Sequence, residues 1–216
     1  MRLTLYDKEI SSMMNALDFY GRMWIGQYKE ILFQLQWYVD LPIDEDLEKD
    51  VEALLSLIRP YMYPELDTNL NVSHGIYNPK VADTAGLSYN ILQVLRYKTA
   101  YAKHPGGGTT VEFSTPFATG KEPLPECTVT KDADEKLTAE LTLSEKYANI
   151  VRKALQMKQC FENLDILGIF QMCTNNADAL KYAEKTTALC KQLEPINNAE
   201  EKDMTEKLLE KINAAT

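Results

Sequence analysis

Few side chains in this 216-residue chain have types suited to catalysis or metal binding, and their spacing does not bring them together. The two histidines each lie beside glycine or proline, and the four cysteines form no C-x-x-C pair. This pattern predicts free thiols and no metal site. No serine or cysteine occupies a recognisable nucleophile elbow. We therefore expect no catalytic residue, metal or cofactor, while a loop histidine acting as a general base keeps an enzyme of unknown class as an open alternative.

Arginines, aromatic rings and a run of glycines are the residue types here that could hold a small molecule. A guanidinium beside stacked rings is a common way to bind an anionic or nucleotide-like ligand, and successive glycine N–H groups can form an anion nest. The glycines follow a predicted helix and precede a predicted strand, which is the wrong order for a phosphate-binding loop, so a helix stop is the alternative. The candidate ligand-binding residues are Arg22, Trp24, Tyr28, Arg96, Tyr97, Tyr101, His104, Gly106, Gly107 and Gly108.

A single long helix over residues 8–38 is the central predicted element. Its apolar residues recur every three or four positions and line two faces, which is typical of a helix with neighbours on both sides. Gly21 and Gly26 interrupt it, and either close packing of another backbone or contact with a ligand would account for them. Pro42 and its neighbours predict a break at residues 40–42.

The remaining pattern predicts a mainly α fold. We expect a helical domain with a small two-stranded β element, followed by a C-terminal helical hairpin. The strands are predicted at residues 2–6 and 111–113, with Leu3 and Leu5 opposite Val111 and Phe113. Helices are predicted at residues 43–58, 80–103, 144–173, 178–193 and 200–212, a long loop at 61–78, a Pro/Gly/Thr-rich linker at 115–131, and a short helical turn at 134–141. The linker predicts two regions, residues 1–126 and 132–216.

Composition and charge limit the classes of partner. The formal net charge is −9, so the chain does not show the basic surface that binding to nucleic-acid phosphates needs. No apolar run reaches the length of a membrane span, and the first residues lack the features of a signal peptide. We expect a cytoplasmic protein that binds neither nucleic acid nor membrane.

Three stretches of the first region carry a resemblance to a known family. They are GRMWIGQY (residues 21–28), GIYNP (75–79) and LRYKTAYAKHPGGGTTVEF (95–113). Over residues 1–126 the chain resembles a family of small uncharacterised proteins encoded by bacteriophages and other mobile elements. The resemblance implies a phage accessory protein in the host cytoplasm, with interference in host processes as its work, and implies no catalytic residue.

Two non-enzymatic functions remain open. In the first and favoured one, the C-terminal helices associate with a host protein or with a second copy of the chain, as in an inhibitor or counter-defence protein. In the second, the protein binds and sequesters an anionic or nucleotide-like small molecule. Apolar residues exposed between Tyr147 and Phe170 would favour association, and a covered face would count against it.

Overall fold

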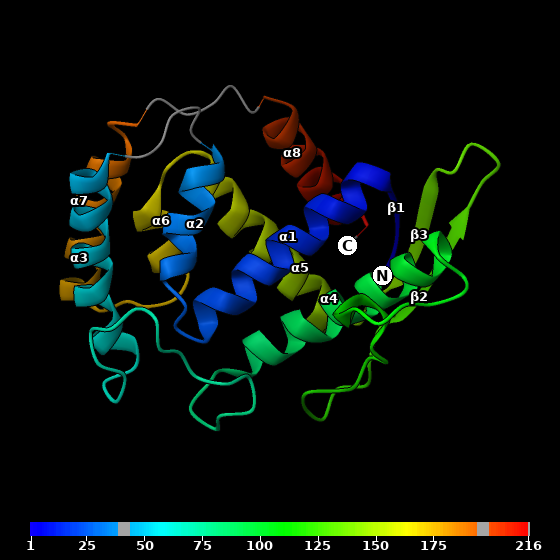
Figure 1. Ribbon diagram of the computed structural model, residues 1–216, viewed down its shortest axis with the longest axis horizontal. Coiled ribbons are helices and arrows are strands. Elements are labelled where there is room, and N and C mark those ends of the chain that lie inside the picture. Colours follow the sequence, from blue (N-terminus) through cyan, green and yellow to red (C-terminus); the bar gives the residue numbers. More distant parts are fainter. Residues whose placement is uncertain (39–43, 194–198, 216) are drawn as a thin grey trace.

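The computed structural model describes residues 1–38, 44–193 and 199–215, and shows a mainly helical protein with a small antiparallel sheet (Figure 1). The predicted fold class is confirmed at this level. The helices are α1 (Asp7–Trp24), α2 (Lys29–Tyr38), α3 (Glu45–Met62), α4 (Asp83–Lys103), α5 (Glu145–Glu162), α6 (Ile166–Gln171), α7 (Ala177–Cys190) and α8 (Ala199–Ala214), with a 3-10 turn η1 (Val111–Phe113) and strands β1 (Arg2–Tyr6), β2 (Glu126–Lys131) and β3 (Leu137–Thr142).

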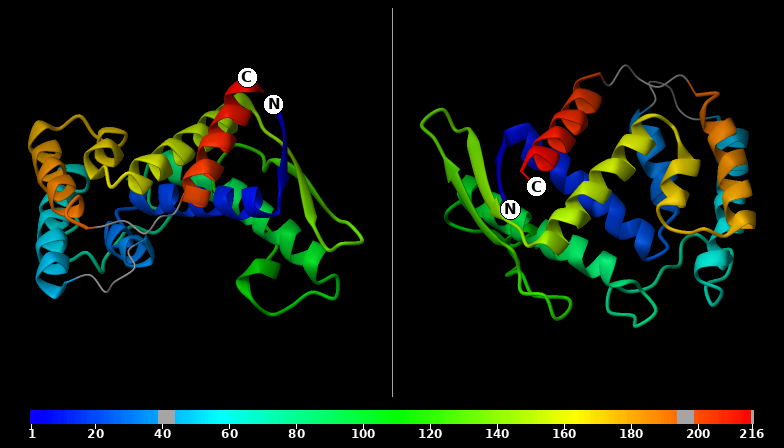
Figure 2. Two further views of the ribbon diagram at one scale, coloured as in Figure 1. Left: turned by 90° about the horizontal axis from the view of Figure 1, so that it is seen from above. Right: turned by 180° about the vertical axis from the view of Figure 1, so that it is seen from behind.

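The helices α1, α4 and α5 form the middle of the molecule, between the sheet at one end and the α3–α7 pair at the other (Figures 1 and 2). The two chain ends lie side by side, and Lys211 of α8 donates to the Thr4 carbonyl of β1 at 3.0 Å. Among the described residues no helix combines the length and apolar character of a membrane span.

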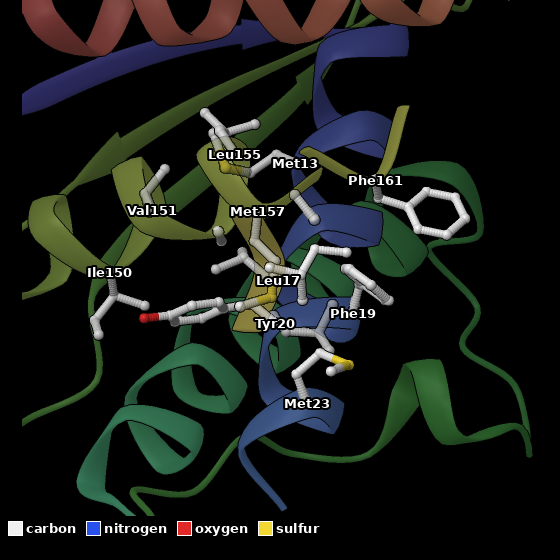
Figure 3. Packing of buried hydrophobic residues seen from close by; sticks show 14 of the residues in the cluster. Met13, Leu17, Phe19, Tyr20, Met23, Ile150, Val151, Leu155, Met157 and Phe161 are labelled. Atoms are coloured by element: carbon white, nitrogen blue, oxygen red, sulfur yellow. The ribbon is translucent and has the colours of Figure 1, made fainter. Parts of the chain in front are cut away.

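The core is built mainly from facing sides of α1 and α5 (Figure 3). The Phe19 and Phe161 rings meet with centroids 5.3 Å apart. Burial of these side chains is the main favourable contribution to folding, at roughly 1.5–3 kcal/mol for each large apolar residue. The predicted apolar side of α5 is therefore covered by the chain itself: the buried residues from this side are Tyr147, Ile150, Val151, Ala154, Met157, Phe161, Leu164 and Phe170.

The prediction of one continuous helix over residues 8–38 is wrong, because the helix is interrupted between Trp24 and Lys29. Gly26 adopts a φ of +83°, in the left-handed region that glycine tolerates. The side chain of Tyr63 donates to the Trp24 carbonyl, and the His74 N–H donates to the Ile25 carbonyl at 3.0 Å. These bonds satisfy carbonyls at the end of α1, so the loop after α3 fixes the break. The break predicted at residues 40–42 lies outside the described residues.

Gly21 faces α4, but the packing of the two helices does not require a glycine there. Ser88 of α4 donates to the Leu17 carbonyl at 2.7 Å, and a β-carbon on Gly21 would lie 3.9 Å from Ser88 and Ala85. The two helices therefore approach closely here without needing the glycine for space.

The predicted strand pair is also wrong. Residues 111–113 form a 3-10 turn, and β1 instead pairs antiparallel with β3, with Leu3 opposite Leu141 and Leu5 opposite Ala139. The sheet has three strands in the order β1-β3-β2. The sequence predicts a linker that includes residues 126–131 and a helical turn over residues 134–141. These residues instead lie in or next to the β2–β3 hairpin, and apolar residues of the hairpin alternate into the core. The predicted boundary between residues 126 and 132 thus falls inside one sheet, and β1 and α1 share a core with β3 and α5.

Two helix ends differ from the predictions. The helix expected to reach residue 173 ends at Glu162, where Leu164 takes a φ of +53° and Asp165 caps α6 through a bond from Gly168 N at 3.0 Å. The helix expected to stop before Pro60 continues to Met62 and includes this proline in its last turn. Ser144 caps α5 as predicted, accepting from Tyr147 N at 3.3 Å.

Paired glycine substitutions test the break in the first helix. Gly26→Ala forces a β-carbon into the left-handed region and to 3.2 Å from the Tyr63 ring, so we expect the free energy of unfolding to fall by about 1–2 kcal/mol. Gly21→Ala meets ordinary contact distances inside a helix, and we expect it to be neutral or to raise this free energy by up to about 1 kcal/mol. Urea unfolding followed by circular dichroism measures both. Equal stabilisation by the two substitutions would indicate a continuous helix.

Candidate functional site

The first group of predicted ligand residues lies at the α1–α2 junction, where its polar atoms are largely engaged. Arg22 Nε donates to Asp18 at 2.6 Å, and its Nη1 lies 3.1 Å from Gln27 Oε1. Tyr28 is fully buried and donates to the Met62 sulfur at 2.7 Å, while burial raises the pKa of its phenol. Trp24 packs against the core beside Tyr20, with ring centroids 6.3 Å apart.

The second group does come together, at the C-terminal end of α4. Tyr97 contacts Tyr101 with centroids 4.8 Å apart, Tyr101 contacts Phe113 at 5.2 Å, and His104 lies 6.5 Å from Phe113. Arg96 Nε is buried without a hydrogen-bond partner in the part of the chain that the structure describes.

Two of the three glycines, Gly107 and Gly108, have structural reasons in this turn. Gly107 has a φ of +77°, and a β-carbon on Gly108 would lie 2.4 Å from the Phe113 ring. The turn is therefore filled by an aromatic side chain that packs on glycine. This arrangement matches the alternative of a helix stop, and Gly106 has open space around it.

The two groups lie at opposite ends of the antiparallel α1–α4 pair. Ser88, near the start of α4, bonds to Leu17 in the second half of α1, whereas Thr99 and Lys103 near the end of α4 line a cavity with Asp7 and Ser11. The ten predicted residues therefore do not form one site. None of them lines any of the three cavities described below, and their role in ligand binding stays a prediction.

A cavity at the N-terminal end of α4 is the better candidate, and we call it the α4 cavity. Its volume is about 570 Å³, within the range of small-molecule sites. One wall is the loop before α4, the other is the segment after η1, and α4 forms the floor. It is lined by Ile76, Tyr77, Asn78, Pro79, Val81, Ala82, Asp83, Gly86, Leu87, Thr119, Gly120, Lys121, Glu122 and Lys146.

Buried amides of α4 hold the segment after η1 in place. The Gln93 side chain pairs with the backbone of Phe117 through two hydrogen bonds, one from Phe117 N at 2.9 Å and one to its carbonyl. Asn90 Oδ1 accepts from Thr119 N at 3.0 Å, and Asn90 Nδ2 donates to the Tyr147 hydroxyl at 3.0 Å. Tyr147 in turn donates to the Pro123 carbonyl at 2.9 Å. A buried polar network that is satisfied in this way defines a single position for the wall.

Close contact between α4 and this segment explains Gly86. The Thr119 hydroxyl lies 2.7 Å from the Gly86 carbonyl and 2.8 Å from Asn90 Oδ1. A β-carbon at residue 86 would lie 2.7 Å from that hydroxyl oxygen, so only glycine leaves room for the contact.

Charged groups of both signs line the α4 cavity. Lys146 Nζ lies 3.0 Å from Glu122, and this hydrogen bond raises the pKa of Lys146. Lys121 is exposed and has no ion-pair partner within the described ranges. Asp83 is the first residue of α4, whose cap residue Ala82 offers no side-chain acceptor to the first turn.

Tyr77 lines the α4 cavity and stacks on Phe117, which lies outside the lining. Tyr77 is 64% exposed and Phe117 is 47% exposed. Their centroids are 6.1 Å apart with an interplanar angle of 26°, and Phe117 also contacts Tyr89 at 6.2 Å. Large exposed rings of this kind are typical of contact surfaces.

A second cavity, between α1, α4 and α8, offers fewer unpaired groups. It has a volume of about 360 Å³. Of its charged groups, Lys8 pairs with Glu200, Glu201 accepts from Lys158 at 2.6 Å, and Asp7 accepts from Leu137 N at 2.8 Å. Lys103 also lines this cavity and has no ion-pair partner among the described residues. A hollow of about 380 Å³ on the sheet is lined by Arg2, Glu126, Cys127, Thr128, Glu140 and Thr142.

Sequence reasoning missed the α4 cavity, although two signals pointed to it. Asn90 and Gln93 are polar residues on an otherwise apolar side of a long helix, which predicts buried hydrogen bonds to another segment. Gly86 inside the same helix predicts close approach of a neighbour. The segment that Asn90 and Gln93 hold, residues 117–123, lies within the predicted linker.

Comparison with known proteins identifies no relative: no protein-family model, curated protein or solved structure matches the chain. Within the ranges that the structure describes, no three histidine, cysteine, aspartate or glutamate side chains are grouped to hold a metal ion. The cysteines are free thiols, and burial raises the pKa values of Cys173 and Cys190 to about 12.

A double-mutant cycle tests the wall of the α4 cavity. Gly86→Ala places a β-carbon against Thr119, and we expect it to lower the free energy of unfolding by about 1–3 kcal/mol. Thr119→Ala removes the hydroxyl. In this background we expect Gly86→Ala to lower the free energy of unfolding by at least about 1 kcal/mol less than it does in the wild-type protein. Denaturant unfolding of the four proteins measures the coupling. Strictly additive effects would contradict the contact.

Proposed function

We propose that this protein is a non-catalytic binding protein that holds a small anionic, ring-bearing ligand in the α4 cavity. The observation that carries the proposal is the placement of Lys121 and Lys146 in a polar cavity that is also lined by Tyr77, an exposed ring that stacks on Phe117. Nucleotide-like molecules combine an anionic group with a flat ring, and this is the chemistry that such a cavity complements.

The cationic side of the ligand site is formed by the two lysines. Lys121 has no competing carboxylate within the described ranges and is available to an anionic oxygen, whereas Lys146 is shared with Glu122. A hydrogen bond between charged groups contributes about 1.5–3 kcal/mol. Asp83 in the first turn of α4 lines the cavity and is placed to accept from a hydroxyl or amine of the ligand.

The aromatic side is formed by Tyr77 and Phe117. A base or similar ring stacks on an exposed aromatic face with a free energy of about 1–3 kcal/mol, and the contact tolerates different rings. Because Gln93 anchors the backbone of Phe117, this ring is already in position before a ligand arrives. Preorganisation lowers the entropic cost of binding.

Association through the C-terminal helices is less well supported. The apolar side of α5 that would serve as the interface is buried against α1, α4 and α8, so the surface expected to favour association is covered. The resemblance to phage and mobile-element proteins gives the ligand proposal a context: the protein sequesters a nucleotide-like signal in the cytoplasm of the bacterial host.

Substitution of the lysine without an ion-pair partner tests the proposal. Calorimetric titration with 5′-mononucleotides and 3′,5′-cyclic mononucleotides is expected to find a ligand that binds one to one. We expect Lys121→Gln to weaken this binding by about 10- to 100-fold, because a charge-assisted hydrogen bond is lost. Thermal unfolding of the unliganded variant should match that of the wild-type protein.

Lys181→Gln is the matched control, since Lys181 is an exposed lysine on α7, remote in sequence from the lining residues. It should bind as the wild-type protein does. The absence of binding to every nucleotide of the panel, or wild-type affinity in Lys121→Gln, would overturn the proposal.

A further inference from the structure

His74 lies in the loop between α3 and α4, where both of its ring nitrogens have hydrogen-bond partners. The side chain is only 8% exposed. Nε2 lies 2.8 Å from Glu65 Oε1, and Nδ1 lies 2.8 Å from Asn78 Nδ2. The edge of the Tyr63 ring covers it, with centroids 4.9 Å apart.

The bonds of Asn78 determine where the imidazole carries its proton. Asn78 Oδ1 accepts from Lys80 N at 3.0 Å, so the amide NH₂ is the end that faces His74. An amide NH₂ can only donate, and therefore Nδ1 must be an unprotonated acceptor. The proton of the neutral ring is then on Nε2, which donates to Glu65.

Asn78 connects His74 to the α4 cavity. It lines the cavity together with its neighbours in the loop that forms one wall. The Asn78 N–H donates to the Gly75 carbonyl at 2.9 Å, and its carbonyl accepts from Val81 N at 2.9 Å. The Asn78 side chain is also bonded to the backbone of this loop, because its Oδ1 accepts from Lys80 N at 3.0 Å.

We propose that His74 is the positioning residue of this wall and makes it pH-sensitive: neutral His74 holds the ligand-binding conformation, and protonated His74 releases it. Protonation of Nδ1 replaces an acceptor with a donor, so two N–H groups face each other. The Asn78 amide must then swing away from His74 or turn over, and it loses its bond to His74 in the first case and its bond to Lys80 N in the second. Histidine is the side chain whose charge commonly changes between pH 5 and 8. The ligand part of this inference rests on the function proposed above.

The charged groups around His74 confine the effect of its protonation to the Asn78 side chain. Glu65 is the carboxylate that faces the ring, and Lys80 Nζ lies 3.3 Å from the same Oε1. A hydrogen bond from its own backbone lowers the pKa of Glu65, as do bonds from Lys80 and His74, so Glu65 remains ionised at mildly acidic pH. The Tyr63 phenol is occupied with the Trp24 carbonyl. Protonated His74 therefore keeps its bond to Glu65, and the rearrangement falls on the Asn78 side chain.

Binding of 3′,5′-cyclic AMP at different pH values tests the inference, because its phosphodiester keeps one negative charge throughout this range. We expect the affinity to fall about tenfold between pH 8 and pH 5.5, which corresponds to the loss of one hydrogen bond. His74→Gln, which cannot titrate, should show a flat profile. His104→Gln removes the other histidine and should keep the wild-type profile.

Nitrogen-15 NMR of the unliganded protein separates this inference from the proposed function. At pH 8 we expect the Nε2–H tautomer of His74, and the amide signals of residues 76–81 should shift with its protonation. Cyclic AMP binding with a flat pH profile in the wild-type protein would overturn the inference and leave the ligand site standing. If the cyclic nucleotide does not bind, coupled shifts of residues 76–81 support the movable wall, and unchanged shifts overturn it.

Discussion

The buried amide of Asn90 is the interaction on which the surroundings of α4 depend. Its oxygen accepts from the Thr119 backbone and its nitrogen donates to Tyr147 of α5. One side chain thus links the central helix, the segment after η1 and the start of α5. Leaving either partner unpaired in the interior costs about 1–3 kcal/mol, so alternative positions of the segment are disfavoured.

This constraint turns a proline- and glycine-containing segment into a wall of the α4 cavity. Residues 117–123 contribute little to the apolar core, and a segment of this composition would be mobile if only its ends were held. The side-chain amides of Asn90 and Gln93 on α4 accept hydrogen bonds from the backbone of this segment. In the loop that forms the opposite wall, Asn78 is hydrogen-bonded to His74. The two walls differ in chemistry, since buried amides of α4 hold the first and an imidazole is bonded within the second.

Much of the helical structure could be predicted from local patterns. The 3.6-residue periodicity located α3, α4, α5 and α7, and the cap at Ser144 was identified correctly. The strands after residue 125 were missed, because threonine and alternating apolar residues lie between breakers and resemble a linker. The pairing of β1 with β3 joins residues more than 130 positions apart. No local pattern specifies a partner at that separation.

For the candidate site too, the sequence determined some features and the tertiary structure determined others. The sequence alone determined the mainly helical class and the acidic net charge. It contained no recognisable catalytic motif, and it suggested that aromatic rings with cationic side chains could hold a ligand. Which rings and cations come together was decided by tertiary structure: Tyr77 stacks on Phe117, and Lys121 and Lys146 line the same cavity. The residues predicted around Arg22 and Arg96 lie outside that lining. Periodicity reports which face of a helix is apolar, because that depends on neighbours in sequence. The convergence of two loops over the start of α4 depends on hydrogen bonds between distant residues, which only the folded chain brings together.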